Sequence, residues 1–298
     1  MVWEPVADLA LLALTILWGT TFHFVHGALK VSSPGVFLAA RFGTATALLV
    51  LLVALRRDRL TPRFWRHSAV LGLLVYLTFA LQTVGLRYTT PSRSAFLTGM
   101  SVLMVPFVCR FWLGRPVRTA AWVGVSLAMV GLAALTRPFG GDVTATVRLG
   151  DALTAGCALA CALQIALLSE WAPRHPLAPF TAVQLAVTFL GGLAMAALEP
   201  RHLDLVNGGA TFVGTVAFTG VVMTAGAFLV QNWAQARTTA VRAALVFSLE
   251  PVAAALFSRF YGGETLAPLD WAGGALIVVG VLVGEVGGAI QSRAAPTA

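Results

Sequence analysis

The second half of this chain repeats the first, and the repeat runs through hydrophobic segments long enough to span a membrane. Residues 79–131 align without a gap with residues 228–280 when they are shifted forward by 149 positions. Apolar matches arise by chance in a chain of this composition, but polar and aromatic matches at one offset indicate an internal duplication. A duplicated set of membrane helices is typical of transporters. The informative matches at this offset are Gln82 with Gln231, Arg93 with Arg242, and Trp122 with Trp271.

The composition indicates a membrane protein. The chain is 58% hydrophobic and only 11% charged over 298 residues, and a soluble domain of this length could not cover so much apolar surface. Lipid offers backbone groups no hydrogen-bond partners, so apolar stretches near the ~20 residues that cross about 30 Å of hydrocarbon predict helices. The predicted membrane-spanning segments are 8–28, 35–55, 68–87, 93–113, 119–136, 149–169, 178–198, 210–231, 240–261 and 269–288.

The order of these segments predicts an inverted repeat. A second, weaker offset of 143 places Asp8 on Asp151, so the first five segments and the last five are two copies of one unit. Each copy crosses the membrane an odd number of times, and the second copy must therefore enter upside down. We expect an all-α membrane protein with ten transmembrane helices, built as two inverted five-helix repeats (residues 1–140 and 141–298) around a central cavity.

The basic residues predict an orientation rather than a nucleic-acid partner. The chain has 20 Lys and Arg against 12 Asp and Glu, a net charge of +8. Twelve of the basic residues flank the segments on the side of the termini and seven lie on the other side. Cytoplasmic loops carry the excess of Lys and Arg, so both termini are expected in the cytoplasm. The first segment lacks the features of a cleaved signal peptide and is expected to be retained.

Short motifs spread over nearly the whole chain resemble one family of membrane carriers. They are Trp18-Gly19-Thr20-Thr21-Phe22, Arg41-Phe42, Phe96-Leu97-Thr98-Gly99 with Val105-Pro106, Ser248-Leu249-Glu250-Pro251-Val252, and Gly263-Glu264 with Trp271-x-Gly273. Together they are similar to the EamA branch of the drug/metabolite transporter superfamily. The resemblance implies a ten-helix carrier of the bacterial inner membrane that moves small metabolites. In length and layout the chain also resembles the YddG-like branch, whose members export aromatic amino acids. Arg115 departs from the pattern, because many relatives have there the glutamate found here at Glu264.

A polar stripe on one helix face predicts the binding site. A buried amide has donors and an acceptor, so it can bind an amino or carboxylate group without burying a charge. Neighbouring rings form an apolar wall for an aromatic substrate. The alternative is that the glutamines bridge helices and the rings only pack. The stripe consists of Thr224, Phe228, Gln231 and Gln235, and Tyr76, Phe79 and Gln82 repeat part of it in the first half.

Further candidates for the cavity wall lie on three other segments. Trp18 and Phe22 share one face of segment 8–28, and Gln164 lies within segment 149–169. Phe96 and Met100 are four residues apart on one helix face, where a plain core stripe explains them equally well.

Two cysteines have the spacing of metal ligands but lack the rest of a site. Cys157 and Cys161 are four residues apart, and no His or carboxylate is placed to complete the coordination of a metal. We expect them to be small core residues and expect no metal.

Four residues are candidates for coupling or gating. Arg41 lies about six residues into its segment, near enough to the outer surface for its side chain to snorkel there. Glu250 precedes Pro251 and either carries a coupling proton or accepts a hydrogen bond from a backbone amide left unpaired by the proline. Pro106 and Pro251 would bend their helices and act as hinges, although proline is also frequent in ordinary membrane helices.

These features predict a transporter that exports small metabolites, most plausibly aromatic or neutral amino acids, by alternating access. Transport of nucleotide sugars, sugar phosphates or drugs is the alternative, but anionic substrates would require several basic residues in the cavity, and only Arg41 is embedded.

Other classes of protein are less consistent with the sequence. An intramembrane enzyme would require paired carboxylates, a Ser/His arrangement or a metal cluster, and a non-transporting membrane subunit would need no cavity. No GxxxxGK[ST] motif is present, so we expect no cofactor and an energy source in gradients. The expected partners are a small-molecule substrate and membrane lipids, and a monomer is the simplest state.

Overall fold

Helices form nearly all of the chain in the computed structural model, which describes residues 3–54, 60–89, 91–138, 144–200, 203–261 and 265–294. Within these residues, nine segments are long and apolar enough to cross a membrane, and α1 contains a shorter apolar stretch, Pro5–Thr21. The protein is a multi-pass, all-α membrane protein, as the composition predicts. The helices that form single crossings are α1 (Trp3–Leu29), α2 (Pro34–Val53), α3 (Pro62–Gly85), α6 (Thr119–Thr136), α7 (Ala145–Trp171), α8 (Leu177–Leu198) and α13 (Pro268–Ala294).

Three of the ten crossings are interrupted. The fourth runs through α4 (Pro91–Gly99), α5 (Ser101–Phe107) and a π-helical turn, η1 (Val108–Trp112). The eighth runs through α9 (Leu205–Gly220), a π-helical turn, η3 (Val221–Gly226), and α10 (Ala227–Gln235), and the ninth through α11 (Ala240–Phe247) and α12 (Glu250–Tyr261). A short 3-10 turn, η2 (Ala172–Arg174), follows α7.

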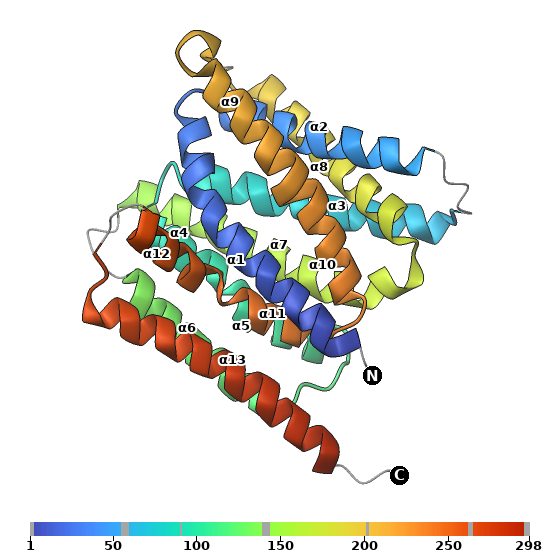
Figure 1. Ribbon diagram of the computed structural model, residues 1–298, viewed down its shortest axis with the longest axis vertical. Helices are drawn as coiled ribbons and strands as arrows, with labels where there is room; N and C mark the ends of the chain where they lie inside the picture. The colour runs from blue at the N-terminus through green and yellow to red at the C-terminus, as the bar shows by residue number, and fades with distance from the viewer. Residues whose placement is uncertain are drawn as a thin grey trace.

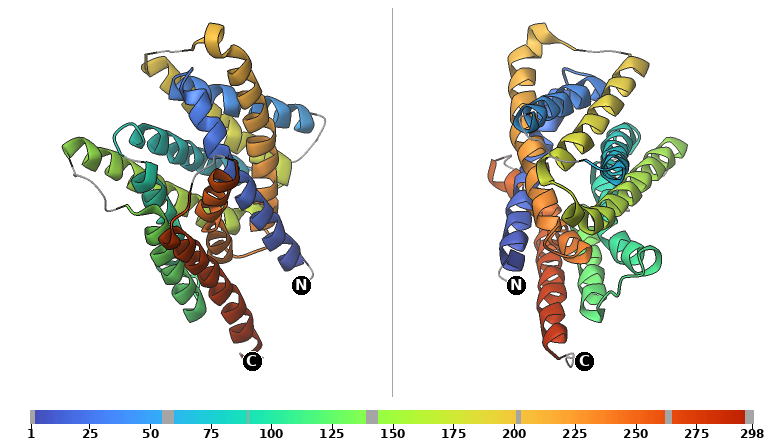
Figure 2. Two further views of the ribbon diagram at one scale, coloured as in Figure 1. Left: turned by 60° about the vertical axis from the view of Figure 1, so that its left-hand side comes forward. Right: turned by 90° about the vertical axis from the view of Figure 1, so that its right-hand side faces the viewer.

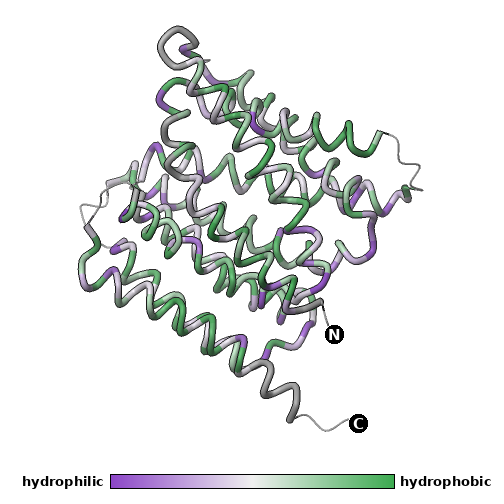
Figure 3. Tube along the Cα trace, in the orientation of Figure 1, coloured by the Kyte–Doolittle hydropathy of each residue, from purple (hydrophilic) through white to green (hydrophobic). Residues whose placement is uncertain are grey.

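The bundle has the polarity of a membrane protein. In Figure 3 the helices are largely hydrophobic along their length, and hydrophilic residues gather toward the helix ends. Helix α1 begins and α13 ends at the same end of the bundle (Figures 1 and 2), as an even number of crossings requires. Large apolar side chains stay exposed on the outside, and Phe111 and Phe260, which the 149-residue offset relates, are 75% and 74% exposed. Lipid chains would cover such side chains in a bilayer.

Helices α6 and α13 meet along a seam of glycines that proves the inversion of the repeat. A Cβ atom added to Gly124 would lie 2.4 Å from the carbonyl oxygen of Gly280, and one added to Gly131 would lie 2.5 Å from that of Gly273. The offset of 149 converts Gly124 into Gly273 and Gly131 into Gly280, so symmetry exchanges the two contacts. Such an exchange requires antiparallel helices with a pseudo-two-fold axis between them. The inverted five-helix repeat is thus confirmed.

The interruptions of the fourth and ninth crossings obey the same symmetry. The break between α4 and α5 falls at Met100, and the offset moves this position to Leu249, between α11 and α12. In the second repeat, Pro251 is the second residue of α12, where its missing N–H is not needed. In the first repeat, Pro106 lies inside α5 and the widened turn η1 follows it.

An aspartate of the second repeat binds two residues of the first repeat. The hydroxyl of Thr89 donates a hydrogen bond to Asp151 at 2.6 Å, and the guanidinium of Arg93 forms an ion pair with the same carboxylate. A second nitrogen of Arg93 donates to the carbonyl oxygen of Pro138 at 2.8 Å. This group, Thr89, Arg93 and Asp151, is called the first clamp, and it joins the start of the fourth crossing to the start of α7.

The symmetry-related group lies at the opposite end of the bundle. Thr238 donates to Asp8 at 3.1 Å, and Arg242 forms an ion pair with Asp8 and donates through Nε to Glu285 at 2.7 Å. We call Thr238, Arg242 and Asp8 the second clamp. Its threonine and arginine match those of the first clamp at offset 149, and its aspartate matches at offset 143. The first clamp lies where the fourth and sixth crossings begin, and the second clamp lies where the first and ninth crossings begin. The first and ninth crossings begin at the end of the bundle where the fourth and sixth finish, so the two clamps close opposite ends.

The boundary expected between the repeats, at residues 140 and 141, lies outside the residues that the structure describes. The described part of the chain resumes at Thr144, whose hydroxyl accepts a hydrogen bond from the backbone N–H of Val147 and caps α7.

The glycine seam predicts the effect of one added methyl group. Gly124→Ala places a Cβ against a backbone carbonyl, and overpacking of this kind costs about 1–3 kcal/mol, so we expect a lower melting temperature in detergent. Gly214→Ala is the matched control, because nothing lies within 4 Å of its added Cβ and alanine favours the helix by about 1 kcal/mol. Equal melting temperatures for the two variants would contradict the close contact.

Candidate functional site

Five aromatic rings from five helices meet inside the bundle. The ring of Phe42 on α2 lies 5.1 Å from Phe79 on α3 and 6.4 Å from Phe228 on α10, measured between centroids. The ring of Trp18 on α1 lies 6.1 Å from Phe228 and 5.7 Å from Phe247 on α11. These five residues, called the aromatic cluster, bring both repeats together. Their rings pack on one another as a continuous apolar surface.

Arg41 is buried beside the aromatic cluster and points into the bundle. Its side chain is 4% exposed, its Nε donates to the hydroxyl of Thr224 at 2.7 Å, and its guanidinium carbon lies 5.2 Å from the centre of the Phe79 ring. The expectation that Arg41 snorkels to the surface is therefore wrong. A hydroxyl acceptor and the negative face of an aromatic ring stabilise the cation inside. No carboxylate of the described residues forms an ion pair with it.

The π-helical turn η3 supplies two of the acceptors at this site. Trp18 donates from its indole nitrogen to the carbonyl oxygen of Met223 at 3.2 Å, and Thr224 receives Arg41. A π-helical turn widens the helix and changes the direction of its carbonyls, and such turns are frequent at functional sites. Gly220 precedes the turn, and a Cβ there would lie 3.0 Å from the carbonyl oxygen of Arg41, so glycine permits the close approach of α2.

Two glutamines of the second repeat form a buried polar pair between α7 and α10. Gln231 of α10 donates to the side-chain oxygen of Gln164 of α7 at 3.4 Å, and the two side chains are 3% and 5% exposed. The side-chain oxygen of Gln231 and the side-chain nitrogen of Gln164 have no partner among the described residues. Buried polar atoms are nearly always paired, and the exceptions need an explanation. The pair thus leaves one buried acceptor and one buried donor unsatisfied within the described residues.

Gln235 extends this polar face by one helical turn. Its side chain is 0% exposed, and neither atom of its amide has a hydrogen-bond partner in the described part of the chain. Thr224, Phe228, Gln231 and Gln235 therefore line one side of the eighth crossing, as the sequence spacing predicts.

Gln82 does not belong to this pair. It donates to the hydroxyl of Thr98 at 3.1 Å, a bond that links α3 to α4. This contact is the helix-bridging role that the sequence leaves open as the alternative. Gln82 and Gln231 thus occupy equivalent positions in the two repeats but have different hydrogen-bond partners.

Three other candidates have their described contacts away from the glutamine pair. Tyr76 lies over Gly191 of α8, where an added Cβ would be 2.4 Å from the ring. Phe96 packs against a cluster of apolar residues of α6 and α13 that includes Ile277. Met100 is partly buried at the break between α4 and α5.

The acidic candidate lies at the other broken helix. Glu250 is partly buried in the first turn of α12, where a carboxylate is favoured by the helix dipole. Gly19 of α1 allows a close approach there, because its Cβ would lie 3.0 Å from the carbonyl oxygen of Glu250. The side chain of Phe22 and the whole of Gly263-Glu264 lie outside the described part of the chain.

Two rings of the aromatic cluster, Phe42 and Phe247, were not expected from the sequence. Thr224 and Gln235 were part of the predicted stripe, and Phe42 stood within a family motif, which was a signal for it. Phe247 carried no such signal, because only the fold brings α11 against Trp18. The sequence shows Arg93 with Arg242 and Asp8 with Asp151 as matched positions of the repeat. It does not show which of these side chains bind one another.

Comparison with known proteins identifies the family. Residues 5–137 and 148–284 each match the EamA-like transporter family. The chain belongs to this family. The family expected from the motifs is therefore confirmed, and this EamA-family chain is a membrane transporter.

Relatives and a solved structure agree with the assignment. An "Uncharacterized transporter" of Archaeoglobus fulgidus is 29% identical over 93% of this chain and 85% of its own length. The "Uncharacterized inner membrane transporter YedA" of Escherichia coli is 26% identical over 93% of this chain and 90% of its own length. One crystal structure superposes with a TM-score of 0.79 at 21% identity, covering 95% of this chain and 97% of that chain, and it confirms the fold.

Arg41 predicts an unusual stability change. Arg41→Met removes a buried cation that has no carboxylate partner and keeps an apolar chain of similar length, so we expect the melting temperature in detergent to rise. Arg93→Met is the control, because it removes the partner of Asp151 and should destabilise the protein by about 1–3 kcal/mol. A fall for Arg41→Met as large as that for Arg93→Met would mean that Arg41 is a structural anchor.

Proposed function

We propose that this transporter exports aromatic or neutral amino acids across the bacterial inner membrane by alternating access. One observation carries the proposal: the Gln164–Gln231 pair has one unpaired donor and one unpaired acceptor and lies beside the aromatic cluster. Both termini lie in the cytoplasm in this proposal, as the distribution of basic residues predicts. Residues 1–140 and 141–298 are the two repeats that move against each other.

The donor and the acceptor of the glutamine pair match the two ends of a zwitterion. The side-chain nitrogen of Gln164 donates to a carboxylate, and the side-chain oxygen of Gln231 accepts from an ammonium. Neutral amides do both without bringing an uncompensated charge into the bundle. An aromatic side chain then packs on Phe228, which lies one turn from Gln231 on the same helix face.

Arg41 lies at the far end of this site. Thr224, which holds Arg41, precedes Gln231 by seven residues, a rise of about 10 Å along the helix. The zwitterion at Gln231 and the guanidinium thus lie on either side of the substrate's ring. This favours amino acids with large apolar side chains over small ones, because only a large side chain spans the distance.

The inward direction of Arg41 favours one second candidate, a phosphate-bearing metabolite such as a sugar phosphate or nucleotide sugar. A phosphate group pairs well with a guanidinium. Its several charges would however require further basic residues beside Arg41, and the described contacts of Arg41 are with Thr224, Phe42 and Phe79.

The two clamps are suited to alternating access. They close opposite ends of the bundle and both join one repeat to the other, so opening one while the other stays closed exposes the centre to one side. The symmetric breaks at Met100 and Leu249 give the fourth and ninth crossings hinge positions near the site, with Pro106 and Pro251 beside them. Glu250, at the start of α12, carries the coupling proton in this scheme.

The binding site predicts transport of aromatic amino acids in proteoliposomes. We expect saturable uptake of labelled phenylalanine, and we expect Gln164→Met and Gln231→Met to lower it by about tenfold or more, since each removes a buried hydrogen bond to the substrate. Gln184→Met is the matched control, because this buried glutamine donates to the carbonyl oxygen of Phe180 in its own helix. Uptake that both site variants leave unchanged, or competition by sugar phosphates but not by amino acids, would overturn the proposal.

The clamps predict opposite changes of access. In a cysteine-free background with Met100→Cys as the probe, Asp151→Asn should increase labelling by an impermeant maleimide from one side of the membrane. Asp8→Asn should increase it from the other side, because Arg242 then keeps only Glu285, which belongs to the same repeat. Glu170→Gln, which breaks the exposed pairs with Arg115 and Arg174, is the control and should change neither. Labelling from the same side in both aspartate variants would contradict the gating role.

A further inference from the structure

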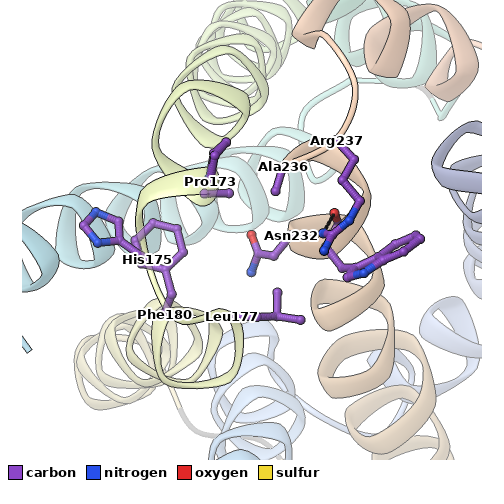
Figure 4. A pocket seen from close by; sticks show the side chains of 9 residues that line it. Pro173, His175, Leu177, Phe180, Asn232, Ala236 and Arg237 are labelled. Carbon is purple, nitrogen blue, oxygen red and sulfur yellow. Dashed lines mark hydrogen bonds between the residues drawn. The ribbon is translucent and has the colours of Figure 1, made fainter. Parts of the chain in front are cut away.

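A cavity lies where η2, α8 and α10 meet at one end of the bundle (Figure 4). Its volume is about 330 Å³, within the range of small-molecule sites. It lies at the end where α10 finishes and α8 begins, which is the end closed by the second clamp. The lining residues are Ala172, Pro173, His175, Leu177, Phe180, Asn232, Trp233, Ala236 and Arg237.

Asn232 points into this cavity with an unpaired oxygen. Its side chain is 0% exposed, its nitrogen donates to the hydroxyl of Thr181 at 2.6 Å, and its oxygen has no partner among the described residues. Thr181 donates its one hydroxyl hydrogen to the carbonyl oxygen of Leu177 at 2.9 Å, so it can only accept from Asn232. This fixes the direction of the amide, and the atom that Asn232 offers to the cavity is an acceptor (Figure 4). A ligand must bring a donor to it.

Arg237 supplies the opposite chemistry at the rim. Its guanidinium carbon lies 4.7 Å from the centre of the Trp233 ring, and one nitrogen donates to the carbonyl oxygen of Trp233 at 2.8 Å. No described carboxylate forms an ion pair with Arg237. These contacts hold the guanidinium in place while its remaining N–H groups stay available to an anion.

The rest of the wall is uncharged. Burial and the neighbouring charge of Arg174 lower the pKa of His175, so its imidazole is neutral at pH 7. Its Nε2 lies 2.9 Å from Nδ1 of His67, which keeps the ring against Phe180. Leu177 and Phe180 add apolar surface. The cavity therefore presents one fixed cation, one buried acceptor and an apolar wall.

We propose that this cavity is a second binding site, which takes a small zwitterion with its anionic group on Arg237 and its ammonium group on the oxygen of Asn232. Gln231 and Asn232 are adjacent in the chain but contact different helices, α7 and α8, so the two sites are separate. Binding here does not depend on transport through the centre. A free amino acid and the headgroup of phosphatidylethanolamine share this pairing of an anion with an ammonium.

Equilibrium binding of labelled phenylalanine to the purified full chain in detergent tests the proposal. We expect two sites per chain, and we expect Arg237→Gln and Asn232→Leu each to weaken one of them by about tenfold or more, the loss of one charge-assisted hydrogen bond. Arg237 is exposed, so its substitution should leave the fold intact even if Asn232→Leu disturbs it. Gln231→Met should weaken only the other site. Wild-type stoichiometry and affinity in Arg237→Gln would overturn the proposal.

Two further arms separate the ligand sources and the two proposals. Nanodiscs of phosphatidylethanolamine that abolish the Arg237-dependent binding, while phosphatidylcholine nanodiscs preserve it, assign the lipid headgroup as the occupant. Equal binding in both assigns the free amino acid. If no amino acid is transported but the Arg237-dependent site remains, the central proposal fails and this one stands.

Discussion

Each repeat of this transporter supplies one aspartate that binds a threonine and an arginine of the other repeat. Asp8 and Asp151 thereby hold the two halves together at opposite ends of the bundle, where the helices leave the hydrocarbon. Charged groups of this kind are costly in lipid unless paired, so the arrangement restricts how the halves can assemble. The space between the clamps is left for the aromatic cluster and the glutamines. The position of the site thus follows from the two clamps.

The repeat allowed most of the fold to be predicted and part of the site. The ten crossings, their inversion and the polar face of the eighth crossing follow from residue spacing, because membrane length and helical period leave few alternatives. The π-helical turns could not be predicted, since a hydrophobic sequence such as Val221–Gly226 fits an α-helix equally well. Arg41 was misplaced for a related reason: its depth in the segment is readable, but the acceptor on Thr224 belongs to another helix.

The two repeats have the same backbone fold but differ in the charged residues that they carry. The counterpart of Arg41 at offset 143 is Gln184, a neutral amide that donates to the carbonyl oxygen of Phe180 in its own helix. The counterpart of Glu250 at offset 149 is Ser101, also beside a helix break. The cation therefore belongs to the first repeat and the carboxylate to the second. In the proposed transport cycle, a symmetric framework with an asymmetric set of charges can give its two open states different affinities.

The glycine contacts between α6 and α13 also fix the register of these helices. At Gly124 and Gly131 the helices touch backbone to backbone, and these two glycines of α6 are seven residues apart. Sliding one helix by a single turn would bring Leu127 or Ala128 against a carbonyl, and no side-chain rearrangement can relieve a clash with backbone. In the proposed transport cycle, the two repeats would therefore pivot at this contact rather than slide along it.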